Sequence, residues 1–301
     1  MLLLPLLGSG GEGTRPVASR PPGERPDTLD QVRFEDAQAV SVDPRGRLYV
    51  ADAGRDAVVI LSPSGETLNV LGGAGTRAGQ FLDPADVDPT NGQTLYVADA
   101  GNGRLQRFSD DLQYLESLPV GREFADGRTR RAFDDGRDGS RTRGDGRPIA
   151  VESSAGDHTF AIDEQARVVL KWDAQRRPER VVGDDVQSRG RLDEPVALAL
   201  EKGRRLYVAD RGREAILVYD RFGSFVRRLN TPALPEVRAL TFRQGRLWVV
   251  CPDRLLLWNP DTERLTEHPL DLTAPLVDVA PVSNRLYVLT STRLWIRDNP
   301  R

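Results

Sequence analysis

Short apolar segments separated by polar turns recur along the whole chain. Residues 48–54 read LYVADAG, residues 95–101 repeat it, and residues 206–212 read LYVADRG. Weaker copies are TFAID at 159–163, LWVVC at 247–251 and LYVLT at 286–290. Around the first copy, the pattern predicts four short strands at 39–42, 48–51, 58–61 and 67–71. The inner segments are apolar almost throughout, which is typical of strands covered on both faces.

The spacing of the six copies predicts the architecture. Their aromatic markers, separated by 47, 64, 47, 41 and 39 residues, are Tyr49, Tyr96, Phe160, Tyr207, Trp248 and Tyr287. One four-stranded propeller blade takes about 40–50 residues. We therefore expect an all-β chain folded as one six-bladed β-propeller of four-stranded antiparallel blades. The one long step carries an insertion.

The VAD-x-G pattern followed by an apolar strand resembles NHL repeats, and six copies resemble the six-bladed NHL and TolB-like propellers. The resemblance covers residues 34–297. It is strong in copies one, two and four, and loose in copies five and six, where Cys251 and Thr290 replace the repeated aspartate. It implies a bacterial, monomeric binding disc whose face contacts protein, peptide or RNA.

A closed ring needs its last gap filled, because an open sheet edge leaves backbone groups unpaired. The sixth copy supplies only three strands before the chain ends, so we expect the fourth from the N-terminus. The candidate is Arg15–Arg20, with Leu29–Phe34 as the alternative, and deletion of residues 1–34 should lower the melting temperature. Residues 14–301 would then form one domain, preceded by an apolar and flexible segment at 1–13.

The insertion at 121–148 contains four Asp-Gly pairs and eight arginines. It has few apolar residues to offset chain entropy, and this composition predicts a long mobile loop that proteases cut first. Two functional alternatives are an arm for an anionic partner and a calcium loop on Asp134, Asp135 and Asp138. The spacing of these acids does not follow the alternate-ligand calcium loop, and Arg137 would lie among them.

Two sets of charged residues recur in the repeats. Four acids stand at the same position of their copies, namely Asp52, Asp99, Asp163 and Asp210. We expect them to accept backbone N–H bonds at the following turn, a structural role that each blade needs. Arg55, Arg104 and Arg213 lie in the turns after the marker strands, where they would form a basic arc on one disc face or serve as solvated turn residues.

Motifs for catalysis are absent from the sequence. The two histidines, His158 and His268, lie in different copies, whereas zinc sites usually join two or three histidines with a carboxylate. No nucleophile elbow or phosphate loop is present. Cys251, the only cysteine, lies in an apolar strand, so it is expected to be a buried hydrophobe and can form no intrachain disulfide.

One enzymatic alternative leaves no local motif. Calcium-dependent lactonases on six-bladed propellers, which this chain resembles in repeat number, assemble their site from scattered acids around the central channel. The candidates here are Asp86, Glu236 and Asp278, each at or beside the start of an inner strand.

The net charge and the N-terminal sequence say little about the function or the location of the protein. The net charge of -3 gives no support for a polyanion partner, so nucleic acid is a third alternative only. The apolar run Leu2–Leu7 is too short to span a bilayer, and Ser9 stands where a lipoprotein cleavage box would have cysteine. Export to the periplasm or beyond and a cytoplasmic location both remain open. The leading hypothesis is a non-catalytic module without cofactor that binds a protein or peptide; the alternative is the calcium-dependent lactonase or esterase.

Overall fold

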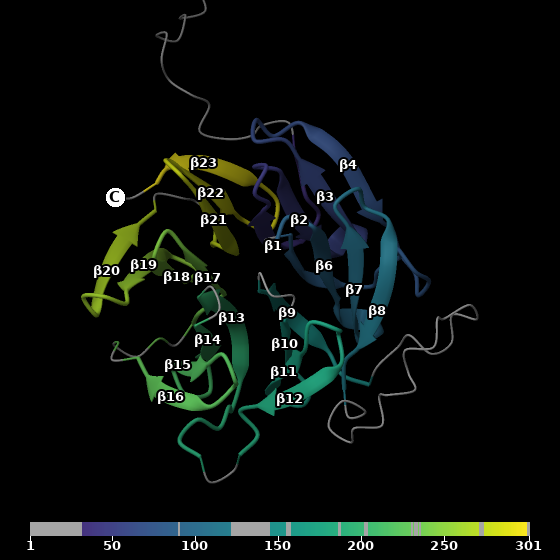
Figure 1. The fold of residues 1–301 in the computed structure, drawn as a ribbon. Coiled ribbons are helices and arrows are strands. Elements are labelled where there is room, and N and C mark those ends of the chain that lie inside the picture. The colour runs from purple at the N-terminus through teal and green to yellow at the C-terminus, as the bar shows by residue number, and fades with distance from the viewer. Residues whose placement is uncertain are drawn as a thin grey trace, which may run out of the picture.

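Six antiparallel sheets are arranged around a common axis in the computed structural model, and their inner strands face the hub of the ring (Figure 1). The structure describes residues 32–89, 91–121, 145–154, 158–185, 188–201, 204–229, 231, 234, 236–270 and 274–299. The predicted six-bladed propeller is therefore confirmed.

The blades follow the chain in order. Blade 1 consists of β1 (Ala37–Val42), β2 (Leu48–Asp52), β3 (Ala57–Leu61) and β4 (Thr67–Gly72). Blade 2 consists of β5 (Pro84–Asp88), β6 (Thr94–Asp99), β7 (Arg104–Ser109) and β8 (Tyr114–Pro119). Blade 3 consists of β9 (Pro148–Ser153), β10 (Thr159–Asp163), β11 (Val168–Trp172) and β12 (Pro178–Val182).

The second half repeats this arrangement. Blade 4 consists of β13 (Pro195–Glu201), β14 (Arg205–Asp210), β15 (Ala215–Asp220) and β16 (Phe225–Arg228). Blade 5 consists of β17 (Ala239–Arg243), β18 (Arg246–Val250), β19 (Arg254–Asn259) and β20 (Arg264–Pro269). Blade 6 has three strands among the described residues, β21 (Asp278–Val282), β22 (Arg285–Leu289) and β23 (Leu294–Asp298).

The repeated marker lies in the second strand of each blade, and all six marker aromatics are buried. In blades 1 and 2 the strand continues into a single 3-10 turn, η1 (Ala53–Arg55) or η2 (Ala100–Asn102). Each turn ends on a left-handed residue, Asp56 with φ of 49° or Gly103 with φ of 64°. The short polar residues after the marker thus reverse the chain into the third strand.

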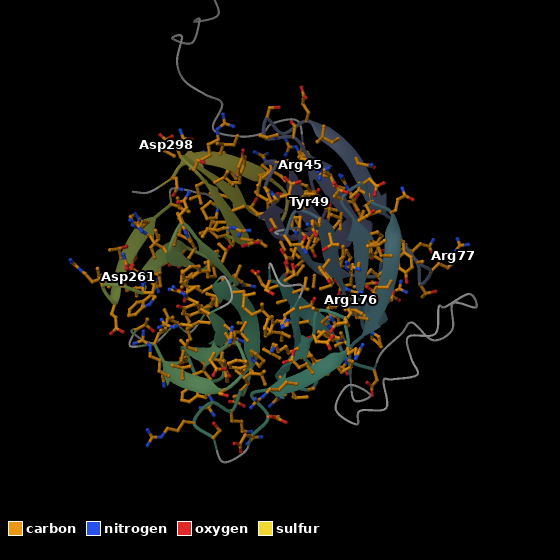
Figure 2. All side chains as sticks on the ribbon, in the orientation of Figure 1. Arg45, Tyr49, Arg77, Arg176, Asp261 and Asp298 are labelled. Atoms are coloured by element: carbon orange, nitrogen blue, oxygen red, sulfur yellow. The ribbon has the colours of Figure 1, made fainter. Side chains whose placement is uncertain are left out.

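The hydrophobic core is divided among the six interfaces between neighbouring blades, and each interface has one cluster of buried side chains. Figure 2 shows side chains filling the spaces between adjacent sheets. Because both faces of each inner sheet region are covered, the inner strands need apolar residues at nearly every position. This packing explains the weak period-two alternation in the sequence.

The ring closes between blades 6 and 1. Val32 and Phe34 are buried in the cluster that these two blades share. The amide of Phe34 donates to the carbonyl of Thr292 at 3.1 Å, and that of Ala37 donates to Ser291 at 2.8 Å. Residues 32–34, the described part of the alternative closing strand, are not in a strand. The preferred strand, Arg15–Arg20, lies outside the described residues, and its role stays a prediction.

Most of the insertion at 121–148 also lies outside the described residues, including Asp134, Asp135 and Asp138. The same is true of the apolar run Leu2–Leu7. In the part of the chain that the structure describes, no helix has the length and apolar character needed to cross a membrane.

Candidate functional site at the hub

A cavity lies at the hub of the ring and is lined by the first strands of the blades, with all six blades contributing. Its volume is about 70 Å³. One water needs roughly 10–15 Å³ on this measure, so the cavity has room for about five waters or a small organic group.

Two of the cavity residues break the symmetry of the repeat. In each blade, one residue of the first strand pairs with the residue of the second strand that comes just before the position of the repeated aspartate. Its occupants around the ring are Ala39, Asp86, Ala150, Ala197, Ala239 and Asp278. Four blades therefore carry alanine where blades 2 and 6 carry aspartate. A structural need shared by all blades cannot explain the two acids.

A second symmetry break occurs at the position that pairs with the marker aromatic. Its occupants are Ser41, Asp88, Glu152, Ala199, Thr241 and Ala280. Blades 2 and 3 thus place carboxyl groups, on Asp88 and Glu152, where the other blades have small residues. Both acids line the cavity together with Asp86 and Asp278.

Asp86 and Asp278 hold neighbouring blades together. Asp86 Oδ2 accepts from the amide of Val151 in blade 3 at 2.7 Å, and its Oδ1 accepts from Val87 at 2.7 Å. Asp278 repeats this geometry, with Val40 in blade 1 donating to Oδ2 at 2.8 Å and Val279 donating to Oδ1 at 2.7 Å. Both oxygens of each acid are therefore engaged by backbone amides.

Asp88 is fixed in a similar way. Its Oδ2 atom accepts from the amide of Ser153 at 2.5 Å and from the Ser153 hydroxyl at 2.6 Å. The bond again joins blade 2 to blade 3. Three cavity acids thus act as clamps between inner strands.

Glu152 differs from these three acids. Its side chain lines the cavity, and the structure gives its carboxyl no hydrogen bond or ion pair among the described residues. Its carboxyl is consequently free to contact a ligand or water in the cavity.

The hub favours protonated carboxyl groups. Burial raises the pKa of Asp86 to about 7 and that of Asp278 to about 8, although backbone amides oppose the shift. Burial also raises the pKa of Glu152 well above its usual range, and the charge of Asp88 adds to this while Arg243 opposes it. Perturbed carboxyl groups gathered in one cavity are typical of functional sites.

The metal hypothesis does not fit this geometry. Among the described residues, no three acidic, histidine or cysteine side chains are grouped so that they could hold a metal ion. The oxygens of Asp86 and Asp278 are already occupied by amides, whereas a calcium ion needs six to eight oxygen ligands. No calcium chemistry is therefore derived for the hub.

Glu236, the third predicted channel acid, does not line the cavity. Its side chain is 55% exposed and pairs with Arg238 at 2.7 Å. The reason is register, because β17 begins at Ala239 and the position equivalent to Asp86 is Ala239 itself. Sequence reasoning missed Asp88 and Glu152, although an acid inside an otherwise apolar first strand was a visible signal.

The four repeated aspartates accept backbone amides at the outer end of the marker strand. Asp52 accepts from Asp36 at 2.8 Å, Asp99 from Leu82 at 2.8 Å, and Asp210 from Asp193 at 2.7 Å. These donors belong to the segment that leads into the first strand, whereas the sequence predicted donors in the following turn. The Asp52 side chain makes no capping hydrogen bond to its turn, and Asp210 accepts from Arg213 there at 3.1 Å. Asp163 accepts there from Arg147, and it also accepts in its own turn from Gln165, both at 3.1 Å.

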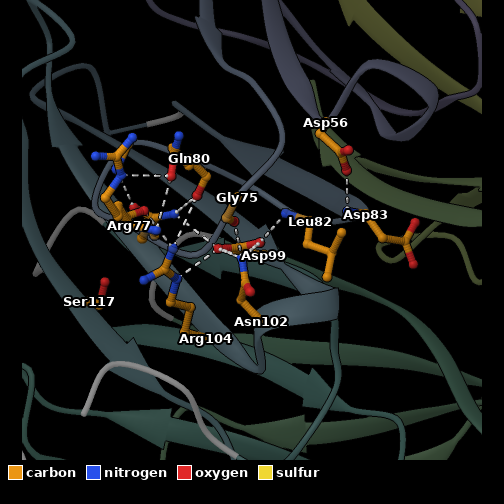
Figure 3. A network of polar contacts seen from close by, with 12 residues as sticks. Asp56, Gly75, Arg77, Gln80, Leu82, Asp83, Asp99, Asn102, Arg104 and Ser117 are labelled. Atoms are coloured by element: carbon orange, nitrogen blue, oxygen red, sulfur yellow. Dashed lines mark hydrogen bonds and ion pairs between the residues drawn. The ribbon is translucent and has the colours of Figure 1, made fainter. Parts of the chain in front are cut away.

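The proposed arc of three arginines is not formed. Arg104 is 1% exposed and pairs with the buried Asp99 at 2.7 Å, so it cannot contact a partner on the disc face. It also donates to the carbonyls of Arg77 and Gln80 and thereby fixes the loop before blade 2 (Figure 3). Arg104 is five residues after Asp99, whereas Arg55 and Arg213 are three residues after their aspartates.

The remaining candidates lie apart from the hub. Arg55 is near Asp52 and Glu35, at 3.4 and 3.5 Å, and Arg213 lies at the rim of blade 4. His268 is in the outer strand β20, and His158 precedes β10. Cys251 is buried, and burial raises the pKa of its thiol, which disfavours a thiolate nucleophile.

Comparison with known proteins gives a fold and no family. No protein-family model matches the chain, and no curated protein matches it significantly in sequence. The NHL-repeat assignment therefore stays a prediction.

Several solved structures with a similar fold are structures of enzymes. A gluconolactonase from Xanthomonas campestris has 18% identity and a TM-score of 0.63, covering 91% of this chain and 89% of that one. A streptogramin B lyase has 9% identity and a TM-score of 0.60, covering 90% and 86%. Virginiamycin B lyase from Staphylococcus aureus has 10% identity and a TM-score of 0.57, covering 88% and 84%. At these identities the likeness shows the shared propeller architecture alone.

Proposed function

We propose that the chain binds a small polar molecule in the hub cavity and hydrolyses an ester or lactone there, with Glu152 as the acid. The observation that carries this proposal is Glu152 itself, a cavity carboxyl with no protein partner among the described residues, surrounded by three acids that are fixed by backbone amides. A gluconolactonase and two lyases share the architecture, which supports an enzymatic role as much as a scaffold role.

The chemistry follows from the proton on Glu152. A protonated carboxyl donates a hydrogen bond, and the carbonyl oxygen of an ester or lactone accepts one. This bond draws electrons from the acyl carbon, to which the oxygen of a water then bonds while the acyl–oxygen bond breaks. The two protons of that water end on the product acid and the product alcohol, and Glu152 is regenerated.

The environment favours the protonated form of Glu152. Burial raises its pKa, and the nearby acids penalise a further negative charge. Activity should therefore fall as the pH rises through the raised pKa of Glu152. A lyase-type reaction that depends on histidine has less support, since an alanine variant at a histidine of virginiamycin B lyase is catalytically inactive and neither histidine of this chain lines the hub cavity.

The test is a hydrolysis assay with a panel of γ- and δ-lactones and short p-nitrophenyl esters, with and without added divalent cations. We expect turnover that Glu152→Gln abolishes and that Glu267→Gln, an acid on the outer strand β20, leaves unchanged. The proposal is wrong if no panel member is turned over and none raises the melting temperature, or if Glu152→Gln retains full turnover.

A second candidate is peptide binding on the disc face that carries the turns after the marker strands. Leu82 is 40% exposed there, and the amide of Asp83 donates to Asp56 at 2.7 Å, so this loop lies beside the turn that contains Arg55. An exposed apolar residue thus lies in a loop beside a turn that carries a basic residue. Pull-down with the purified chain and with Leu82→Asp would test it, and a specific partner retained by both proteins would contradict this surface.

A further inference from the structure

A groove with an arginine-rich wall lies at the outer rim of blade 4, beside β16, which forms the edge of the ring (Figure 1). Its volume is about 490 Å³, within the roughly 300–1,000 Å³ of typical small-molecule sites. Four arginines line it, namely Arg189, Arg213, Arg227 and Arg228. The site is separate from the hub, because its residues come from the two outer strands of blade 4, β15 and β16, and from connecting loops.

The floor of the groove is aromatic and held in place. The ring of Phe225 packs edge-on against Tyr219 with centroids 6.0 Å apart. The Tyr219 hydroxyl donates to the carbonyl of Gly190, and a Cβ at Gly190 would meet Phe225 Cβ at 2.4 Å. Only glycine therefore allows the loop after Arg189 to lie this close to Phe225. The loop positions Arg189 next to the apolar floor.

The charges of three of these arginines are not neutralised. Arg227 pairs with Glu263 of blade 5. Arg213 donates to the carbonyl of Arg189 at 3.1 Å, and Arg228 donates to that of Arg213 at 3.3 Å. Among the described residues, Arg189, Arg213 and Arg228 have no carboxylate within ion-pair distance.

This arrangement leaves donors available. A guanidinium carries five N–H groups in a planar fork, and the bonds to carbonyls use few of them. The guanidinium of Arg228 is bonded to the backbone of Arg213, and that of Arg213 to the backbone of Arg189, and all three residues line the same groove. Like charges along one groove repel each other, and a bound anion would offset that repulsion.

We propose that the groove binds a small molecule in which an oxyanion, a phosphate monoester or a carboxylate, is attached to an apolar group. The oxyanion contacts Arg213 and Arg228, because planar guanidinium groups bind such oxyanions with paired hydrogen bonds. The apolar group contacts Phe225 and Val226, both of which line the groove. The volume fits a small molecule, and the net charge of -3 does not favour a nucleic-acid chain.

The experiment is calorimetric titration of the full chain with phenyl phosphate at low salt. Parallel titrations use three further ligands. Phenylacetate replaces the phosphate by a carboxylate, inorganic phosphate tests the charge without the apolar group, and benzyl alcohol tests the apolar group without the charge. The test variants are Arg228→Gln and the double variant Arg213→Gln/Arg228→Gln. The matched control is Arg221→Gln, which removes the same charge from an exposed turn of blade 4, where Arg221 lies over the Phe222 ring at 4.5 Å.

We expect phenyl phosphate or phenylacetate to bind more tightly than inorganic phosphate and benzyl alcohol. Each groove arginine should contribute about tenfold in affinity, and Arg221→Gln should bind as the unaltered chain does. Equal weakening by Arg221→Gln would show non-specific surface attraction and overturn the proposal. So would the absence of binding by either aromatic oxyanion at concentrations up to about 10 mM, which would half-fill even a site with a dissociation constant of about 10 mM. Binding of benzyl alcohol as tight as that of the aromatic oxyanions would also overturn it. Arg228 is exposed, so its single variant is expected to fold even if the double variant does not.

Discussion

Asp278 in blade 6 and Val40 in blade 1 join the two ends of the ring, since the Oδ2 atom of Asp278 accepts the Val40 amide at 2.8 Å. The residues are separated by 238 positions in the sequence. Asp86 and Val151 form the same bond between blades 2 and 3 at 2.7 Å. Two acids of the cavity therefore also fix the relative positions of the inner strands that form it.

Replacement of Asp278 by alanine should destabilise the chain by about 1–3 kcal/mol, because the buried Val40 amide loses its acceptor. Asp86→Ala should have a similar effect, because its geometry is the same. Urea denaturation at pH 6 measures both. The control is Asp253→Ala, whose side chain is 73% exposed and should change stability by less than about 0.5 kcal/mol. Equal stability of Asp278→Ala and the control would contradict a closing role.

The hub should make stability depend on pH. The folded-state pKa values of Asp86 and Asp278, about 7 and about 8, lie above the ordinary value of 3.8. Between these pKa values the folded chain holds protons that the unfolded chain has lost. The contribution of the two acids to folding stability is therefore fully present below about pH 4 and declines as pH rises to about 8.

The slope should be roughly 1 kcal/mol per pH unit for each acid. Melting temperatures at pH 5, 6, 7 and 8 can be compared with those of Asp86→Asn and Asp278→Asn, in which the titrating group is absent. The difference in stability between the unaltered chain and each variant should shrink as pH rises. A difference that stays constant with pH would show that these groups do not titrate in this window.

Loss of the buried Arg104 should be costly. Removing one member of a buried ion pair leaves an uncompensated charge and costs about 3–5 kcal/mol. Arg104→Ala leaves Asp99 buried and also frees the loop carbonyls of Arg77 and Gln80. Chemical denaturation should show this loss, whereas Arg55→Ala, at a 37% exposed side chain, should cost less than about 1 kcal/mol. Similar values for the two variants would refute the structural role of Arg104.

The fourth strand of blade 6 can be tested by truncation. Val70 pairs with Val59, whose side chain lies in the cluster shared by blades 6 and 1, so Val70 faces the blade 6 side. It is 54% exposed and Leu68 is 53% exposed, and β23 has no outer neighbour among the described residues. We predict that residues 1–31 supply a strand at this edge.

Deletion of residues 1–31, which spares the buried Val32 and Phe34, should lower the melting temperature by more than about 2 °C, the shift that 1 kcal/mol produces in a large domain. Deletion of residues 1–13 is the control and should have little effect. An unchanged melting temperature after the longer deletion would exclude this closure.

Much of the fold could be predicted because it depends on local sequence. The marker aromatics, the turns after them and the forty-residue spacing lie within single blades, and hydrophobic burial acts on each copy in the same way. The repeated aspartates were found for the same reason. Strand ends differed by one or two residues, as for β1, which begins at Ala37 rather than at the predicted residue 39.

The hub could be predicted only in part. Asp86 and Asp278 stand at strand starts, where the sequence placed them, but Glu236 falls three residues before its strand. Glu152 was missed because its importance depends on facing five other inner strands. The arginine groove was also invisible, since Arg189, Arg213 and Arg228 come from three separate segments.

The sequence alone therefore determined the architecture, the number of blades and the residues that each blade buries, because those are properties of a repeated local pattern. Only the tertiary structure decided which acids meet at the hub, that Arg104 is buried beside Asp99, and which arginines remain unpaired at the rim. The physical reason is that ring closure and strand register bring together side chains from different repeats, and burial and charge then act on groups that no single repeat contains.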